Sequence, residues 1–216
     1  MPSPRRLLLL RHGETSHNRD GIWQGHLDVP LSATGQGQAK AAGGALAAYG
    51  PVRIVSSDLQ RAARTAEAVA AACGVKVDLD ARWREFDVGR WTGLSGAEVI
   101  ARNPEERARA LRGEEQRRGI DGEGPAQVAA RVRPALDALI ASLAPGECGV
   151  VVSHGGTIRI ISGLLLGIDP VTHTRLFAGP GNCQWADLVE TDAASRWRLA
   201  GWNLRPGPTC SAGEVT

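Results

Sequence analysis

Two histidines in this chain follow apolar runs that end in turns. His12 lies between Arg11 and Gly13, directly after four leucines, and His154 follows three valines and a serine and precedes two glycines. Each apolar run is typical of a buried strand. In open α/β sheets, ligands bind where the carboxyl ends of the strands meet. Two histidines and an arginine at that edge indicate phosphate chemistry.

Taken alone, His12 would be interpreted as structural, because a lone histidine more often is. The order of the motifs along the chain changes that interpretation. The chain carries Leu10-Arg11-His12-Gly13-Glu14-Thr15, Asn18, Gln24-Gly25, Leu31-Ser32-Ala33-Thr34-Gly35, Ser56-Ser57-Asp58-Leu59-Gln60-Arg61-Ala62, Thr65-Ala66, Arg84-Glu85-Phe86, Gly89, Trp91-Thr92-Gly93 and Ser153-His154-Gly155-Gly156. Together these motifs resemble the histidine phosphatase superfamily, the phosphoglycerate-mutase-like proteins, and the resemblance extends from Leu7 to about Asn203.

The resemblance implies a role for each catalytic position. His12 would attack phosphorus and become phosphohistidine, which divides one difficult displacement into two easier ones. Its attacking nitrogen must be neutral, so the other nitrogen should donate a hydrogen bond to a backbone carbonyl. Arg11 and Arg61 would bind the phosphate, since a guanidinium matches phosphate oxygens. His154 would donate to the phosphoryl oxygens in the transition state.

Arg61 and Glu85 each have a neighbouring rival. Arg61 could be a solvated helix residue, with Arg64 one turn further on, but its place after a strand and the family pattern favour it. Glu85 would be the general acid and then the base that activates water. Its rival is Asp87. The neighbours Trp83 and Phe86 could exclude water from Glu85 and raise its pKa.

The remaining polar positions have weaker signals. Asn18, Gln24 and Gly25 match family positions that line the phosphate pocket, although each alone would be an ordinary loop residue. The amides of Gly155 and Gly156, at a helix N-terminus, could assist in binding phosphate. Asn182 is a further candidate for a polar contact near the site. Trp23 is a candidate for a residue that flanks the substrate.

The site requires elements that alternate between strands and helices. This alternation predicts parallel crossovers and a three-layer α/β/α sandwich with a mostly parallel sheet, phosphoglycerate mutase-like. Asp58 is the expected N-cap of the second long helix. The arginines and glutamates of 102–118 indicate a solvated helical face, with helix in pieces over 95–118. The expected strands are 6–11, 52–56, 75–79, 150–153, 185–190 and 197–202, and the expected long helices are 33–49, from Asp58 to about 73, 127–143 and about 157–166.

Length and composition limit the function classes. The 216 residues, 43% of them apolar, predict one globular domain over residues 1–205 and a disordered tail over 206–216. The net charge of +2 is too small to indicate nucleic acid or an anionic membrane surface. The apolar run before Arg11 is too short for a signal peptide or a membrane span. The four cysteines lack metal-ligand spacing, so we expect reduced thiols in a cytoplasmic protein rather than a disulfide in an exported one: Cys73, Cys148, Cys183 and Cys210.

The family contains both phosphatases and mutases, and the sequence favours a phosphatase. Its cofactor-dependent mutases carry a long basic insertion between the glutamate and the second histidine. The segment from Glu85 to His154 is compact by comparison, and it lacks the serine expected after Glu123. The expected substrate is a small phosphate ester such as a sugar phosphate, glucosyl-3-phosphoglycerate or α-ribazole phosphate. We expect no metal and no cofactor. A phosphoglycerate mutase and an inactive phosphate-binding regulator remain alternatives, and the sequence leaves open whether a homodimer forms.

Overall fold

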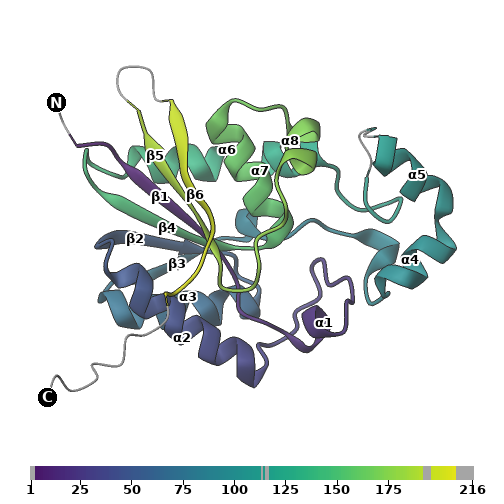
Figure 1. The fold of residues 1–216 in the computed structure, drawn as a ribbon, viewed down its shortest axis with the longest axis horizontal. Coiled ribbons are helices and arrows are strands. Elements are labelled where there is room, and N and C mark those ends of the chain that lie inside the picture. The colour runs from purple at the N-terminus through teal and green to yellow at the C-terminus, as the bar shows by residue number, and fades with distance from the viewer. Residues whose placement is uncertain (1–2, 113, 115–116, 192–195, 208–216) are drawn as a thin grey trace, which may run out of the picture.

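The computed structural model describes residues 3–112, 114, 117–191 and 196–207. Cys210 and residues 208–216 of the predicted tail lie outside this part of the chain. Figure 1 shows a sheet with helices on both of its faces.

The six strands form one sheet in the order β3-β2-β4-β1-β5-β6. β1 to β4 pair in parallel, whereas β5 and β6 are antiparallel, so the predicted mostly parallel sheet is confirmed. β4 pairs with β1 so that Arg11 lies opposite Ser153. His12 and His154, which follow these residues, therefore leave the sheet side by side. The strands are β1 (Arg6–Arg11), β2 (Pro51–Ser56), β3 (Val77–Leu79), β4 (Cys148–Ser153), β5 (Trp185–Glu190) and β6 (Trp197–Leu204).

The helices complete the predicted three-layer sandwich (Figure 1). α2 and α3 pack together on one face of the sheet, and α6, α7 and α8 pack together on the other. α4 and α5 stand to one side of the sheet, beyond the carboxyl end of β1. The helices are α1 (Ser16–Arg19), α2 (Ala33–Ala47), α3 (Gln60–Cys73), α4 (Gly96–Arg102), α5 (Pro104–Arg112), α6 (Pro125–Ala141), α7 (Gly155–Leu166) and α8 (Pro170–Leu176).

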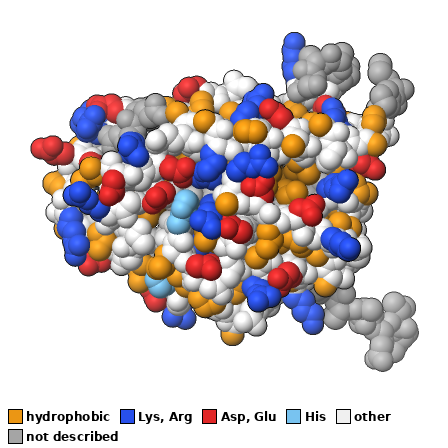
Figure 2. Space-filling model, turned by 180° about the vertical axis from the view of Figure 1, so that it is seen from behind, with side chains coloured by type: hydrophobic (Ala, Val, Ile, Leu, Met, Phe, Trp, Pro, Cys, Tyr) orange, Lys and Arg blue, Asp and Glu red, His pale blue; other side chains and the backbone are white. Residues whose placement is uncertain are grey.

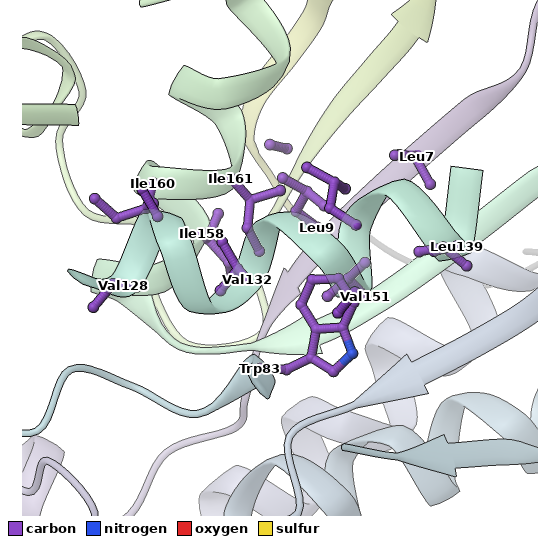
Figure 3. Close-up of a cluster of buried hydrophobic side chains, with 14 of the residues drawn as sticks. Leu7, Leu9, Trp83, Val128, Val132, Leu139, Val151, Ile158, Ile160 and Ile161 are labelled. Carbon is purple, nitrogen blue, oxygen red and sulfur yellow. The ribbon is translucent and has the colours of Figure 1, made fainter. Parts of the chain in front are cut away.

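The leucines of β1 alternate between two hydrophobic cores, because successive side chains of a strand point to opposite faces. Leu7 and Leu9 belong to the core under α6 and α7, where Trp83 is also buried. Figure 3 shows this core, with side chains of α6 and α7 gathered over β1 and β4. Leu8 and Leu10 belong to the core under α2 and α3. With both faces covered, β1 is held rigidly at the position from which His12 extends.

The predicted cap of α3 is wrong. Leu59, not Asp58, is the N-cap residue, and it makes no side-chain capping bond. The Asp58 carboxylate instead accepts two hydrogen bonds from the Arg84 guanidinium, at 2.7 and 2.5 Å. An ion pair between residues 26 positions apart leaves no local signal in the sequence. Gly74 ends α3 in the left-handed region, with a φ of 69°, as expected.

Other boundaries differ by a few residues. The expected strand 75–79 is limited to 77–79, α6 and α7 each begin two residues earlier than expected, and β4 begins at 148 rather than 150. α4 and α5 confirm that the segment after Ser95 is helical in pieces. α1 and α8 were not predicted. Both are short, and α1 depends on a capping box between Thr15 and Asn18 rather than on a hydrophobic periodicity.

The surface agrees with the weak net charge. On the face shown in Figure 2, basic and acidic side chains are interspersed rather than segregated into one basic region. No helix in the part of the chain that the structure describes is long and apolar enough to cross a membrane. Cys73, Cys148 and Cys183 are free thiols.

Candidate active site

A pocket of about 270 Å³ lies at the carboxyl ends of β1, β2 and β4. Its walls include residues of the loop after β1, up to Gly25, and of the segment between Glu85 and Val88. The two segments are joined by hydrogen bonds between the backbones of Trp23 and of residues 93 and 94. The lining residues are Arg11, His12, Asn18, Gly21, Ile22, Trp23, Gln24, Gly25, Arg61, Glu85, Phe86, Val88, Arg118, His154, Gly156 and Arg159. All three predicted catalytic residues are therefore in one pocket.

The two histidine rings lie with their centroids 5.1 Å apart. His12 Nδ1 is 2.7 Å from the carbonyl oxygen of Gly13, which holds this nitrogen as the N–H and leaves Nε2 as the free nucleophilic atom. The hydrogen-bond partner expected for His12 is thus present. Burial and the positive charges of Arg61 and Arg11 lower the pKa of His12 well below its usual value of 6.5. The imidazole is therefore neutral at pH 7, as an attacking nitrogen must be.

His154 is oriented by a serine at the end of β2. Its Nε2 lies 2.9 Å from Ser57 Oγ, while its Nδ1 is buried without a hydrogen-bond partner in the part of the chain that the structure describes. Burial and the nearby Arg61 and His12 lower the pKa of His154 well below 6.5. A neutral His154 whose Nε2 accepts from Ser57 carries its proton on Nδ1, where it is available to a bound oxyanion.

The two predicted phosphate-binding arginines are fixed by backbone carbonyls. Arg61 is only 1% exposed, and its two terminal nitrogens donate to the carbonyl oxygens of Leu27 and Gly25. Arg11 Nη1 donates to the carbonyl oxygen of Pro180 at 2.8 Å. Both Nε atoms are buried without a partner among the described residues, so donors remain for an anion. The rival Arg64 is exposed, pairs with Glu67 and does not line the pocket.

Glu85 receives hydrogen bonds from the first turn of α7. Its carboxylate accepts from the backbone amides of Phe86, Gly156 and Thr157 at 3.0 to 3.1 Å. Gly156 allows this close approach, because a Cβ there would lie 2.5 Å from Glu85 Oε1. The Gly156 amide therefore binds Glu85 in this structure, and its assistance in binding phosphate stays a prediction.

The expected rise in the pKa of Glu85 is wrong. Burial raises it, but the amides of Gly156 and Phe86 and the charges of Arg118 and Arg159 outweigh burial and lower the pKa. Phe86 lines the pocket as expected, whereas Trp83 points into the core under α6. The rival Asp87 accepts a hydrogen bond from the Gly89 amide and does not line the pocket.

The polar candidates in the loops fall into two groups. Asn18 and Gln24 line the pocket, and each bonds to Thr15, which connects them to one another. Asn182 is behind them: its side-chain amide donates to the His12 carbonyl oxygen and to Asn18 Oδ1. Gly25 and Trp23 also line the pocket, while Gly155 packs against Arg11 without lining it.

Two arginines of the pocket were missed by the sequence reasoning. Arg118 was assigned to a solvated helical face, but it lies in a turn before α6 and reaches the pocket. Arg159 lies on α7, five residues after His154. Because α7 begins directly after His154 at the edge of the pocket, the nearness of Arg159 to this histidine in the sequence was a local signal. Arg118 had none, because the turn that carries it is positioned by contacts with residues 87–90.

No group of three or more histidine, cysteine, aspartate or glutamate side chains with metal-binding geometry occurs among the described residues. The donors that face the pocket are nitrogen atoms of arginine, histidine and amide groups, which suit an anion.

Comparisons with known proteins agree on one family. The model of the histidine phosphatase superfamily (branch 1) matches residues 7–205. A glucosyl-3-phosphoglycerate phosphatase of Mycobacterium tuberculosis is 40% identical over 212 residues, which cover 92% of this chain and 94% of the relative. A protein of Yersinia enterocolitica named a probable phosphoglycerate mutase is 34% identical over 212 residues, covering 97% and 93%. The structure of a mycobacterial glucosyl-3-phosphoglycerate phosphatase in complex with VO3 matches with a TM-score of 0.85 at 40% identity, covering 92% of this chain and 98% of that one.

Proposed function

The chain belongs to branch 1 of the histidine phosphatase superfamily and is a phosphatase, and we propose that it hydrolyses glucosyl-3-phosphoglycerate through a phosphohistidine at His12. The observation that carries the mechanism is the free Nε2 of a neutral His12, which lies in a pocket with Arg11, Arg61 and His154. The substrate follows from the relatives that are named for it.

The first step transfers the phosphoryl group to the protein. The lone pair of His12 Nε2 forms the bond to phosphorus while the ester P–O bond breaks. Arg11, Arg61 and the Nδ1–H of His154 neutralise the charge that gathers on the phosphoryl oxygens, which supplies most of the catalysis in phosphoryl transfer. Glu85, in its protonated form, donates a proton to the departing alcohol oxygen.

The second step transfers the group to water. Glu85, now ionised, takes a proton from a water molecule, whose oxygen attacks phosphorus as the bond to His12 breaks. The ionised form of Glu85 is the one that the amides of α7 stabilise, so the resting carboxylate is suited to this step. Asn18 and Gln24 line the same pocket and are proposed to orient the phosphate.

The first test is the identity of the nucleophile. Quenching a turnover in alkali should trap an acid-labile phosphoenzyme on His12, and His12→Ala should lose roughly 10³-fold or more in rate. If His12→Ala keeps most of its activity while His154→Ala loses it, the two roles are reversed. Absence of any phosphoenzyme and of any turnover would support the inactive phosphate-binding alternative.

The second test distinguishes phosphatase from mutase. A phosphoglycerate mutase is the second candidate, because one set of relatives is named for that activity. Inorganic phosphate should accumulate from glucosyl-3-phosphoglycerate without added bisphosphate. Fast isomerisation of 3-phosphoglycerate to 2-phosphoglycerate, with little phosphate released, would instead establish the mutase.

We further propose that residues 1–205 act as one domain in the cytoplasm, consistent with the free thiols at Cys73, Cys148 and Cys183. Light scattering of the purified protein would test whether a homodimer forms.

A further inference from the structure

Arg118 enters the pocket beside Glu85. Its guanidinium carbon lies 4.1 Å from the centroid of the Phe86 ring and 5.5 Å from that of Trp23. Phe86 is the residue after Glu85, and the charge of Arg118 acts on the Glu85 carboxylate. Arg118 therefore lies beside the carboxylate that we propose protonates the leaving alcohol, whereas Arg11 and Arg61 are held by backbone carbonyls.

The turn that carries Arg118 is well anchored. The Arg118 amide donates to the Glu123 carbonyl oxygen, and its own carbonyl oxygen accepts from Gly122. The same turn is bonded to the segment after Glu85, since the Glu123 amide donates to the Asp87 carbonyl oxygen. The two aromatic faces and this backbone framework fix the guanidinium before any ligand binds, which reduces the entropy lost on binding.

The charge of Arg118 has no matched partner in the described part of the chain. No hydrogen bond or ion pair engages its guanidinium there, and its Nε is buried without an acceptor. Burial lowers the pKa of Arg118 to about 10, so the group is still charged at pH 7 although burying it is unfavourable. Glu85 does not satisfy it, because that carboxylate is bonded to backbone amides. A half-buried guanidinium that is held between two aromatic rings and has no acceptor for its Nε among the described residues is suited to bind an anion of the ligand.

We propose that Arg118 binds a carboxylate carried by the leaving alcohol, so that the enzyme prefers phosphate esters of hydroxy acids over those of neutral alcohols. This inference rests on the proposed phosphatase activity and deepens it. In this arrangement the phosphoryl group is bound by Arg11, Arg61 and the two histidines. Its ester oxygen faces Glu85, and the carbon atoms of the alcohol beyond that oxygen lie next to Arg118. A guanidinium and a carboxylate form paired, charge-assisted hydrogen bonds, which are among the strongest available to a protein. Arg159 also lines the pocket and adds positive charge on this side.

The test compares substrates that differ in one charge. The first pair is glucosyl-3-phosphoglycerate and its carboxyl methyl ester, and the second pair is 3-phosphoglycerate and glycerol 3-phosphate. For each pair, the ratio of kcat/KM for the acid to that for the neutral partner is measured. The wild-type protein should favour the acid, and Arg118→Gln should lower the ratio by about 10- to 100-fold, as expected for the loss of a hydrogen bond between charged groups. Arg118→Lys, which keeps the charge but not the paired geometry, should give an intermediate ratio.

The ratio separates recognition from a structural role. If Arg118 only supports the turn or adjusts Glu85, Arg118→Gln slows both members of a pair equally and the ratio stays at the wild-type value, which overturns the inference. Arg64→Gln, an exposed arginine of α3, is the control and should leave the ratio unchanged. Thermal unfolding of each variant checks that it is folded.

The two proposals fail in different ways. Wild-type hydrolysis of the acids with no preference over the neutral partners overturns the role of Arg118 and leaves the phosphatase intact. Hydrolysis of 3-phosphoglycerate with the predicted ratios, but not of glucosyl-3-phosphoglycerate, overturns the proposed substrate and supports Arg118. Hydrolysis of neither acid overturns both.

Discussion

In the proposed mechanism, Glu85 serves two steps that need opposite protonation states. The amides of Phe86, Gly156 and Thr157 stabilise its ionised form, and the pKa of Glu85 is lowered despite its burial. The resting enzyme is therefore prepared to act as a base toward water. The proton for the departing oxygen must reach Glu85 when the substrate binds. The sequence predicts Glu85 as the carboxylate that acts, but the protonation of Glu85 depends on contacts with α7, 71 residues away, which the sequence alone does not indicate.

Glu85→Gln should expose the acid role through the leaving group. The variant keeps the size of the side chain and removes proton transfer, which matters most when the departing oxygen is strongly basic. In single-turnover experiments, phosphorylation of His12 by an alkyl phosphate should slow by roughly 10²–10⁴-fold, and by p-nitrophenyl phosphate only slightly. Dephosphorylation should slow similarly for both substrates, because they share one intermediate. Equal slowing of the first step for both would exclude Glu85 as the acid.

The neutral histidines predict a pH dependence of stability. Because the pKa of His12 and that of His154 are lowered well below 6.5 on folding, the unfolded chain binds more protons just below that pH. Their contribution is complete above pH 6.5 and is lost as the pH falls. Each neutral histidine should make the free energy of unfolding fall by up to about 1.4 kcal/mol per pH unit in this range.

Denaturant titrations of the wild-type protein and of His12→Asn, between pH 7 and pH 5, would measure this slope. The variant removes one titrating group, so its slope should be smaller than that of the wild-type protein. Carboxylates add to the slope in both proteins and cancel in the difference. Identical slopes would mean that His12 is not held neutral by the fold.

At the scale of elements, the contact between α2 and α3 depends on a glycine. A Cβ at Gly43 would lie 2.8 Å from the carbonyl oxygen of Ala68, on the facing helix, whereas a Cβ at Gly44 would meet nothing within 4 Å. The two adjacent glycines of one helix thus have different roles. Gly43 allows the backbones of the two helices to approach closely, whereas Gly44 only lowers the stability of α2 because glycine has a poor helix propensity.

Gly43→Ala should lower the free energy of unfolding by about 1–3 kcal/mol, because the two helices must separate. Gly44→Ala should raise it by about 0.5–1 kcal/mol, because alanine favours the helix and its methyl group meets no other side chain. Denaturant unfolding of both variants measures the two effects. A result of the same sign for both would contradict the packing described here.

The elements themselves were largely predictable, because the apolar runs of β1 and β4 and the caps of α2 carry local signals. Ser32 caps α2 as the sequence indicated. The failures have a common cause, which is that contacts between distant segments override local preference. Asp58 bonds to Arg84 rather than to its own helix, and Arg118 lies in a pocket although the charged residues Glu114 and Arg117 before it are exposed.

At the scale of the whole molecule, the pocket concentrates positive charge that folding must bury. Arg11, Arg61, Arg118 and Arg159 all line it. Burial lowers the pKa of each of them, most clearly for Arg61 and Arg118, to about 10. An anion that binds only the folded state should offset this cost and stabilise the entire chain.

Inorganic phosphate should therefore raise the melting temperature. At a concentration of about 100 times its Kd, binding contributes about 2.7 kcal/mol, which corresponds to a rise of about 5–10 °C for a chain of this length. Differential scanning calorimetry with and without phosphate measures the rise. Arg64→Gln should keep the whole rise, and Arg11→Gln at the same phosphate concentration should lose much of it. A melting temperature that is insensitive to phosphate would contradict the anion site.

The place of β4 between β1 and β2 also governs when the chain can fold during its synthesis. β1 and β2 are made early, but the strand that joins them is Cys148–Ser153. Until the ribosome has released that strand, β1 lacks its parallel neighbour and both hydrophobic layers remain open. A nascent chain that ends before β4 should therefore be degraded by proteases along its whole length. Resistance should appear in one step, once the last histidine of the pocket and the helix behind it have left the exit tunnel.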